Sequence, residues 1–374
     1  MKKKVYVLTI SGFRNYGNRL QAYALPETIR RFGFASTQLN FLLPATAMQA
    51  LRRVSAWLYH RVRRLPWAQV ARAKEPLFRQ FTKEFIPETR VWREVDFVKR
   101  NIGDACYVVG SDQIWNPEFI GVDNRMFLQF APMERRVAYA ASFGVSSIPQ
   151  SQDSRFRQQI ANVPHISTRE KTGASIVKQY TDRDVPVVLD PTMLLKKEDW
   201  LSLPLHRDNM IPQRPFILTY LLRGWNADIR DEVKRFASEH RYHILNVMGD
   251  FFIQDGVVLS PSEFVHAIAQ AELVVSDSYH AAVFSVIMQT PLVSVPRNDG
   301  DRMGSRIDTL LEAFQLEDCR WRSNLRIDDI TSSADFSCAR EILEMKRQQS
   351  LLWLKSAIES SFEHGEGDYE PSKA

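Results

Sequence analysis

Histidine, arginine and carboxylate side chains follow several of the strands that the sequence predicts. His280 comes four residues after the end of the apolar run Leu273–Ser276 and lies at the start of the next expected helix. Arg169 follows another short predicted strand, Ile166–Thr168. Arginine forks bind carboxylate and phosphate groups, and histidine can give or take a proton near neutral pH. Backbone N–H groups of the helix start near Ser278 could also hold a phosphate.

Each of these residues has an ordinary structural explanation as well. His280 could be a buried histidine with satisfied hydrogen bonds, and a histidine on its own favours that interpretation. Arg169 could cap a helix or pair with Glu170, its neighbour in the sequence. If His280 is functional, Asp277 is close enough in sequence to orient its imidazole ring.

The segment after the first expected strand, Val5–Ile10, suits the binding of sugar hydroxyls. It contains Asn15, Tyr16, Gly17 and Asn18. Gly17 permits close approach of the backbone, and asparagine side chains can bind hydroxyl groups. The glycine spacing does not fit a dinucleotide-binding fingerprint, and an ordinary turn is the alternative.

Two further segments carry polar groups. Ser111, Asp112, Trp115 and Asn116 offer a hydroxyl, a carboxylate and an aromatic plate, and Asp112 could act as a base. The alternative is a structural cap at Ser111 or Asp112 with Trp115 in the core. Near residue 300, Arg302 and Arg306 flank a glycine and could clamp an anion, unless they only form surface ion pairs. Asp190 before Pro191 is interpreted as a turn residue.

The expected elements place these segments at strand ends. Strands and helices alternate along 374 residues, which predicts an α/β protein with two doubly wound, mainly parallel sheets. A cluster of prolines marks a junction near 190–212, so the expected domains are 1–190 and 191–374, with the last helix returning to the first domain. Ligands bind such sheets at the carboxyl ends of the strands, so the polar segments could face one cleft.

Composition favours a cytoplasmic location. The chain has no apolar run of membrane-spanning length, and its first residues do not form a signal peptide. Its three cysteines, Cys106, Cys319 and Cys338, fit a reducing compartment and argue against a zinc site. Residues 52–74 are basic and contain tryptophan and tyrosine. They predict either a solvated helix or peripheral contact with the inner membrane face, while no nucleic-acid motif accompanies the charge.

Six segments in order resemble the polysaccharide pyruvyl transferase family. They are 15–25 (NYGNRLQAYAL), 109–117 (VGSDQIWNP), 138–144 (AYAASFG), 166–171 (ISTREK), 189–192 (LDPT) and 276–280 (SDSYH). The resemblance implies a GT-B-like fold of two Rossmann-like domains, with no metal or other cofactor. It also implies phosphoenolpyruvate as the pyruvyl donor and a sugar or lipid-linked oligosaccharide as the acceptor. The product would be a pyruvate ketal on a bacterial capsule, exopolysaccharide or cell-wall polymer, with release of phosphate.

The resemblance also assigns roles to the polar segments. His280 and Asp112 are the expected catalytic residues. The pyruvyl donor would be bound by the C-terminal domain and Arg169, through Arg169, Arg302, Arg306, Ser278 and His280. The acceptor would be bound by the N-terminal domain, through Asn15, Tyr16, Gly17, Asn18, Ser111, Trp115 and Asn116.

One departure from the family pattern keeps other functions open. Ala281 and Ala282 follow His280, where the family commonly has a glycine. A sugar-nucleotide glycosyltransferase of the same fold, or a non-catalytic carbohydrate-binding relative, are the alternatives.

Overall fold

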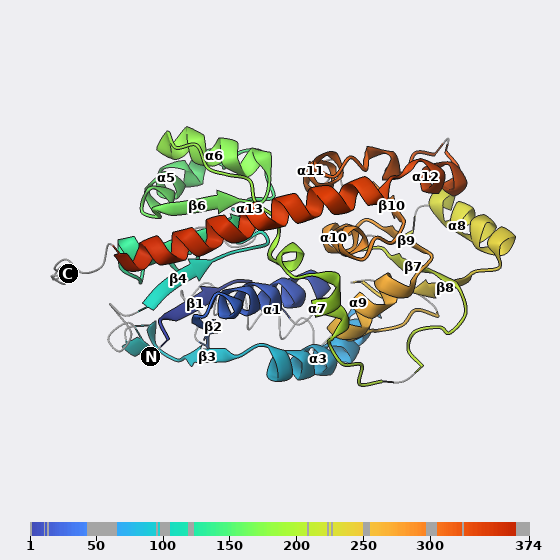
Figure 1. Cartoon of the computed structure of the whole chain (residues 1–374), viewed down its shortest axis with the longest axis horizontal. Helices are drawn as coiled ribbons and strands as arrows, with labels where there is room; N and C mark the ends of the chain where they lie inside the picture. The colour runs from blue at the N-terminus through green and yellow to red at the C-terminus, as the bar shows by residue number, and fades with distance from the viewer. Residues whose placement is uncertain are drawn as a thin grey trace.

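The computed structural model describes residues 2–10, 12, 15–42, 66–94, 96–97, 105–118, 123–207, 209–222, 224–225, 227–249, 255–296, 305–323 and 325–363. Arg302 and residues 52–65 of the basic segment lie outside these ranges. Within them, the chain forms two sheets that lie end to end, each with helices on its faces (Figure 1).

The N-terminal sheet has six strands within the described residues, in the order β3-β2-β1-β4-β5-β6. They are β1 (Lys4–Leu8), β2 (Ala35–Phe41), β3 (Glu88–Val91), β4 (Ala105–Val109), β5 (Arg136–Ala141) and β6 (His165–Thr168). Every pairing between them is parallel, and the order is that of a doubly wound sheet. Because strand order reverses between β1 and β4, the crevice of this sheet lies at their carboxyl ends. Its helices are α1 (Tyr16–Arg31), α3 (Pro66–Phe85), α5 (Asp153–Ala161) and α6 (Lys171–Thr181).

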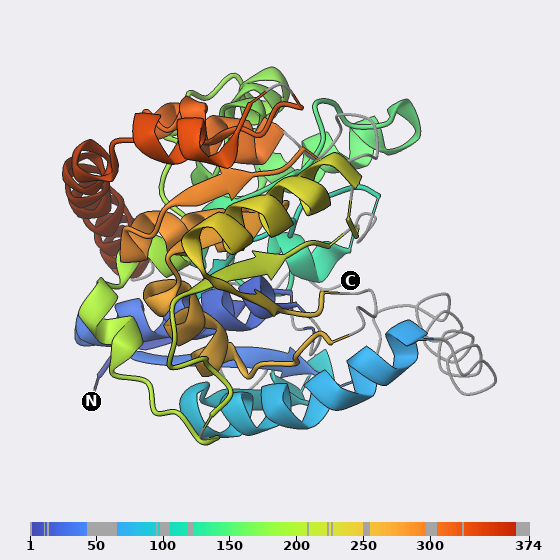
Figure 2. The ribbon, with the colours of Figure 1, turned by 90° about the vertical axis from the view of Figure 1, so that its right-hand side faces the viewer.

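Among the described residues, the C-terminal sheet has four parallel strands in the order β10-β9-β7-β8. They are β7 (Phe216–Tyr220), β8 (His243–Asn246), β9 (Leu273–Ser276) and β10 (Leu292–Ser294). Here the order reverses between β7 and β9, so β9 ends at the crevice of its own sheet. The helices are α8 (Ala227–His240), α9 (Pro261–Gln270), α10 (Tyr279–Met288), α11 (Ser305–Ala313) and α12 (Ile327–Ser333). Figure 2 shows this half from its far end, with α8 in front.

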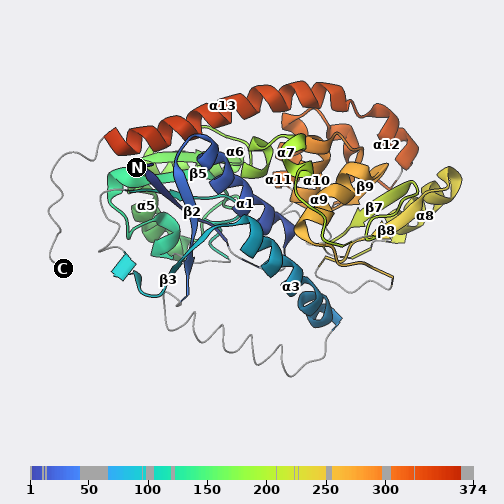
Figure 3. The ribbon, with the colours of Figure 1, turned by 60° about the horizontal axis from the view of Figure 1, so that its bottom comes forward.

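Two segments connect the halves. The first contains a short 3-10 helix, η4 (Pro191–Leu194), and α7 (Lys197–Leu201). The second is the long helix α13 (Phe336–Glu363), which runs along both halves (Figure 3). It contacts β4, β5 and η4, and Arg347 donates from Nε to the Met193 carbonyl at 2.7 Å. Near its far end, the Arg135 guanidinium donates to the Ser361 carbonyl at 3.0 Å.

Several elements differ from the sequence prediction. The apolar sequence at 185–189 predicts a strand, but the structure has a single bridge there, from Val187 to Thr168, because Pro186 cannot donate a ladder hydrogen bond. Helix α1 continues through Pro26, which is buried, and β3 was not expected. Helix α10 begins at Tyr279, two residues earlier than expected, so His280 lies inside its first turn. Ala281 and Ala282 are buried in this regular helix, which therefore accommodates the departure from the family pattern.

Candidate active site

His280 lies where the two halves of the molecule meet. Ser278 caps α10 by accepting from Ala281 N at 3.5 Å, which fixes the helix start. The His280 side chain is only 8% exposed, and its Nε2 lies 3.6 Å from Oδ2 of Asp190. No hydrogen bond to Nε2 is formed within the described residues. On the other side, a Cβ built on Gly17 would stand 1.9 Å from Nδ1. The ring of His280 therefore rests on the backbone of the α1 N-terminus, and only glycine leaves room for it.

Asp190 joins the segments around His280. Its Oδ2 accepts from Arg169 Nη1 at 2.7 Å and lies 3.3 Å from Ser111 Oγ, while Oδ1 accepts from Thr192 Oγ1 at 2.7 Å. Burial raises the pKa of this carboxyl, but the charges of His280 and Arg169 and the Thr192 hydrogen bond hold it well below its ordinary value. Asp190 is thus a buried carboxylate that links the N-terminal sheet to α10.

This arrangement corrects two expectations. The side chain of Asp277, expected near the imidazole, instead accepts from Leu222 N at 2.7 Å and ties the end of β9 to the end of β7. Asp190, expected to be only a turn residue, is both a turn residue and the carboxylate that faces His280. Its position in the 189–192 segment after an apolar run was the one signal in the sequence that could have identified it.

Arg169 supplies a buried cation beside Asp190. Its side chain is 1% exposed, and its guanidinium carbon lies 4.4 Å from the centroid of the Tyr279 ring. Burial lowers the pKa of this group, but Tyr279 and the carboxylates of Asp190 and Asp112 outweigh that effect and raise it. Nε and Nη2 have no hydrogen-bond partner within the described residues. Arg169 therefore stays charged and keeps two nitrogen atoms for a further contact.

Arg306 approaches the same place from α11. It is 7% exposed, and its Nη1 lies 3.9 Å from Oδ1 of Asp112. The same Asp112 oxygen lies 3.7 Å from Nη2 of Arg169, so this carboxylate stands between the two guanidinium groups. With its amide oxygen facing Arg306, Gln113 accepts from Nη1 and Nη2 at 3.1 and 2.7 Å. Gln113 and Tyr279 are thus neighbours of the site that sequence reasoning missed.

Three residues expected to bind the acceptor are instead buried in structural roles. Tyr16 is fully buried, stacks on Phe264 at 4.2 Å between ring centroids, and donates from Oη to the Leu259 carbonyl at 2.9 Å. Trp115 is also fully buried, and its Nε1 donates to the Met126 carbonyl at 2.8 Å. Asn116 is 1% exposed and accepts from Glu118 N at 2.8 Å. These side chains are packed in the core and form hydrogen bonds with backbone groups. The expectation that Trp115 offers an aromatic surface to a sugar is therefore wrong.

The other expected residues remain near the crevice. Asn15 caps α1 by accepting from Asn18 N at 3.3 Å, and both side chains are partly exposed beside Gly17. Ser111 is fully buried, and its Oγ lies 3.1 Å from the Ala140 carbonyl and 3.3 Å from Asp190. The structure therefore brings Gly17, Ser111, Arg169 and His280 together, with Asp112 and Arg306 beside them, whereas Arg302 lies outside the described residues.

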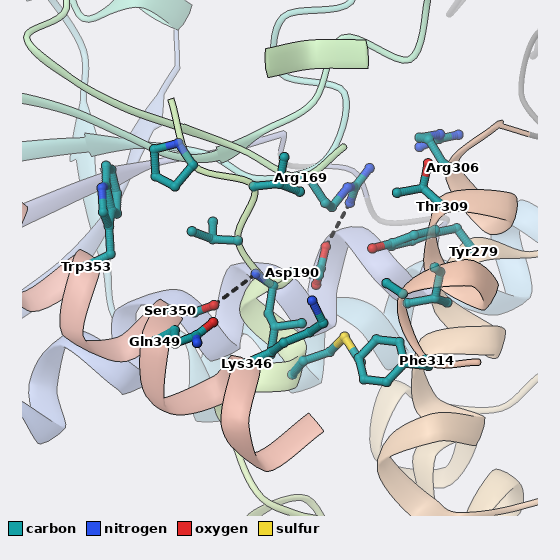
Figure 4. A pocket seen from close by; sticks show the side chains of 17 residues that line it. Arg169, Asp190, Tyr279, Arg306, Thr309, Phe314, Lys346, Gln349, Ser350 and Trp353 are labelled. Carbon is teal, nitrogen blue, oxygen red and sulfur yellow. Dashed lines mark hydrogen bonds and ion pairs between the residues drawn. The ribbon is translucent and has the colours of Figure 1, made fainter. Parts of the chain in front are cut away.

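A pocket of about 220 Å³ opens next to this cluster, between the segment 186–193, α11 and α13 (Figure 4). Arg169, Asp190, Tyr279 and Arg306 form one wall, and residues of α13 form the opposite wall. His280 does not line this pocket. Burial raises the pKa of Tyr279 above its ordinary value, so its hydroxyl is protonated at neutral pH. The described residues contain no group of acidic, histidine or cysteine side chains that could hold a metal ion, and no helix able to span a membrane.

The arrangement suits proton transfer next to an anion. Two guanidinium groups and the N-terminus of α10 favour negative charge, and an ionised carboxylate faces the imidazole that could carry the proton. The residues come from both halves of the molecule, so the site is complete only when the halves are in contact.

Comparison with solved structures supports the fold. A protein described as a UDP-N-acetylglucosamine 2-epimerase from Listeria monocytogenes aligns over 96% of this chain and 97% of its own, with 11% identity and a TM-score of 0.52. The UDP-GlcNAc 2-epimerase of Neisseria meningitidis, bound to UDP-GlcNAc, aligns over 93% and 94% with 10% identity and a TM-score of 0.47. The likeness to the Listeria monocytogenes structure shows a GT-B-like fold and nothing more. A search of curated proteins found no match.

The family is established by a second comparison. A model of the family described as polysaccharide pyruvyl transferase matches residues 15–299. This span contains all six segments on which the resemblance rests, together with Gly17, Ser111, Arg169, Asp190 and His280. The chain belongs to the polysaccharide pyruvyl transferase family.

Proposed function

We propose that this pyruvyl transferase takes its pyruvyl group from phosphoenolpyruvate and places it on two hydroxyls of a sugar in a bacterial surface polysaccharide. The product is a pyruvate ketal, and phosphate is released. The observation that carries the proposal is the buried cluster of Arg169, Asp190 and His280, which spans both halves and offers cationic groups beside an imidazole. Family membership supports pyruvyl transfer in polysaccharide synthesis.

The reaction needs one proton donor and one anion site. The first sugar oxygen bonds to C2 of phosphoenolpyruvate while the C3 methylene takes up a proton and becomes a methyl group. The second sugar oxygen then bonds to C2 as the C2–O bond to phosphate breaks. One of the two hydroxyl protons returns to the proton donor of the enzyme and replaces the proton given to C3. The other leaves with phosphate or passes to solvent. The enzyme must therefore hold a carboxylate and a phosphate while it supplies a proton at C3.

His280 is the proposed proton donor to C3. Asp190 faces Nε2 of its ring at 3.6 Å, and an ionised carboxylate in this position orients an imidazole and stabilises its protonated form. Nδ1 lies on the side of Gly17 and the α1 N-terminus, where the partly exposed Asn15 and Asn18 could meet the acceptor. In this proposal, proton transfer occurs between the two halves of the molecule.

Arg169 and Arg306 are the proposed cations for the pyruvyl donor. Arg169 is fixed by Asp190, and its Nε and Nη2 form no hydrogen bond within the described residues, although they lie 3.9 Å from Glu170 and 3.7 Å from Asp112. Arg306 lies on the other side of Asp112. Asp112 remains the proposed base for the acceptor hydroxyl. In this geometry it also holds the two guanidinium groups apart, so the acceptor hydroxyl must compete with them for its oxygen atoms.

Contact with the inner face of a membrane remains a proposal that rests on residues 52–65. Lys74, at the end of the basic segment, does not support it, because this side chain is 1% exposed and donates to the Gly249 carbonyl at 2.8 Å. Flotation with anionic lipid vesicles at low salt tests the proposal, since a protein that stays at the bottom of the gradient does not bind the vesicles.

Thermal stabilisation by phosphoenolpyruvate tests the pyruvyl donor. A ligand that binds only the folded state raises the melting temperature by mass action. We expect a concentration-dependent shift for the wild type that is strongly reduced in Arg306→Gln, with Arg230→Gln on the exposed face of α8 as the matched control. A shift with UDP-sugar and none with phosphoenolpyruvate would instead favour a glycosyltransferase.

A further inference from the structure

The pocket beside the Arg169–Asp190 pair has an excess of positive charge. Its titratable lining residues are three cations, Arg169, Arg306 and Lys346, together with Asp190 and Tyr279. The carboxylate of Asp190 is already engaged by Arg169, Thr192 and Ser111. Tyr279 contributes a protonated hydroxyl, for which no hydrogen bond is formed within the described residues. Asp112, which lies behind the lining, is 3.7 Å from Arg169 and 3.9 Å from Arg306, so Lys346 is the lining cation with no carboxylate within ion-pair distance among the described residues.

Lys346 is a cation of this pocket for which the described residues provide no structural role. It lies on α13 and is half-buried, and it forms no hydrogen bond or ion pair within the described residues. Its neighbours on the same helix are paired, since Arg347 lies 2.5 Å from Glu344 and Lys355 lies 3.8 Å from Glu359. Figure 4 shows the amine of Lys346 turned into the pocket toward Asp190.

The size and remaining walls of the pocket limit what can occupy it. A volume of about 220 Å³ is smaller than the sites that hold drug-sized ligands, which start at about 300 Å³. Thr309 and Gln349 add polar groups, whereas Met193, Leu310 and Phe314 form apolar walls. A sugar nucleotide or an oligosaccharide is too large, and a small tetrahedral oxyanion fits both the volume and the charge.

We propose that this pocket binds a phosphate group and that Lys346 is its third cation, added by the C-terminal helix to Arg169 and Arg306. The inference rests on the proposed function, in which the phosphate belongs to bound phosphoenolpyruvate before the transfer and is free inorganic phosphate after it. Residues 306 and 346 both lie beyond the family match, which ends at residue 299. The helix that crosses both halves thereby contacts the substrate as well as both domains.

Calorimetric titration of the full chain tests the pocket with three probes: inorganic phosphate, phosphoenolpyruvate and pyruvate. For Lys346→Gln we expect the affinity for phosphate and for phosphoenolpyruvate to fall about tenfold or more, because a charge-assisted hydrogen bond is lost. Lys346→Arg keeps the charge and should retain most of the affinity. Lys355→Gln, on the same helix and 48% exposed, is the matched control and should bind like the wild type. The affinity for pyruvate, which has no phosphate, should depend little on Lys346.

The outcomes separate this inference from the proposed function. If Lys346→Gln binds phosphate and phosphoenolpyruvate as the wild type does, the pocket inference is overturned while the pyruvyl donor assignment stands. If phosphate binds through Lys346 and phosphoenolpyruvate neither binds nor competes, the phosphate pocket stands and the proposed donor falls. Failure of the wild type to bind either probe would overturn both. Unchanged melting temperatures of the unliganded variants would show that a loss of affinity is not a loss of folding.

Discussion

Helices α9 and α10 of the C-terminal half both begin with a serine N-cap, but the partial positive charge of their N-termini is balanced in different ways. In α9, Ser260 Oγ accepts from Glu263 N at 3.2 Å, and Glu263 Oε2 accepts from Ser260 N at 2.7 Å. Glu263 also pairs with Arg207. The carboxylate in the first turn balances the partial positive charge of the helix end. The start of α9 is therefore complete by itself.

The first turn of α10 does not contain a carboxylate that would balance the charge of its own N-terminus. Ser278 caps the helix at 3.5 Å from Ala281 N, but no acid occupies the first turn, and His280 stands there instead. The nearest carboxylate is Asp190, which comes from the connecting segment and which Arg169 also holds. A helix start that relies on residues from distant segments is suited to function, whereas one with its own acid is suited to stability.

Replacement of His280, at the start of α10, should have the largest effect on catalytic activity. His280→Ala removes the proposed proton donor, and we expect a loss of about 10²–10⁴ in kcat, the range for general acid–base catalysis. Phosphate release from phosphoenolpyruvate with a competent acceptor measures it. His240→Ala at the exposed end of α8 is the control. Retention of wild-type activity by His280→Ala would remove the histidine from the mechanism.

Asp190→Asn should uncouple α10 from the N-terminal sheet. Removal of one partner from a buried ion pair costs about 3–5 kcal/mol in the free energy of unfolding, because the other charge stays buried. Since the pKa of Asp190 is depressed in the folded state, its contribution is present above the ordinary value of 3.8 and is lost as pH falls below it. Urea unfolding at several pH values should therefore show a difference between wild type and variant that shrinks below about pH 4. A difference independent of pH would contradict an ionised Asp190.

Gly17→Ala should displace the imidazole without removal of any functional group. The new Cβ would stand 1.9 Å from Nδ1 of His280, so the ring must move. We expect kcat to fall about 100-fold, as for small misplacements of a catalytic group, with a smaller change in the affinity for phosphoenolpyruvate. Gly12→Ala is the control, because its Cβ would meet Asn18 Nδ2 at an ordinary 3.6 Å. Equal activities of the two variants would show that the contact between Gly17 and His280 is not required for catalysis.

Ser260→Ala should have the smallest effect, and only on stability. Loss of an N-cap costs about 1 kcal/mol in the free energy of unfolding, and α9 carries none of the proposed catalytic groups. Thermal unfolding and phosphate release, measured on the same preparation, would show a lower melting temperature with unchanged kcat. A large loss of activity would mean that the start of α9 also serves the reaction.

The sequence predicted the fold better than the site. Alternating strands and helices and buried runs such as Leu273–Ser276 are local signals, and β9 has the predicted bounds. Tyr16 and Trp115 were expected near the acceptor but lie in the core, since an aromatic residue after a strand has the same local pattern in either place. Asp190 and Lys346 were missed because their neighbours come from other parts of the chain: Arg169 for Asp190, and α11 for Lys346. Local sequence patterns do not contain such contacts.

The most direct test of pyruvyl transfer from phosphoenolpyruvate is an NMR assay of its product. The protein is incubated with phosphoenolpyruvate and a panel of free and lipid-linked sugars, and proton and phosphorus spectra are recorded together. The proposed function predicts one ketal methyl signal for each inorganic phosphate formed, with both lost in His280→Ala. In a parallel incubation that also contains a nucleotide sugar, consumption of the nucleotide sugar with phosphoenolpyruvate left intact would contradict it.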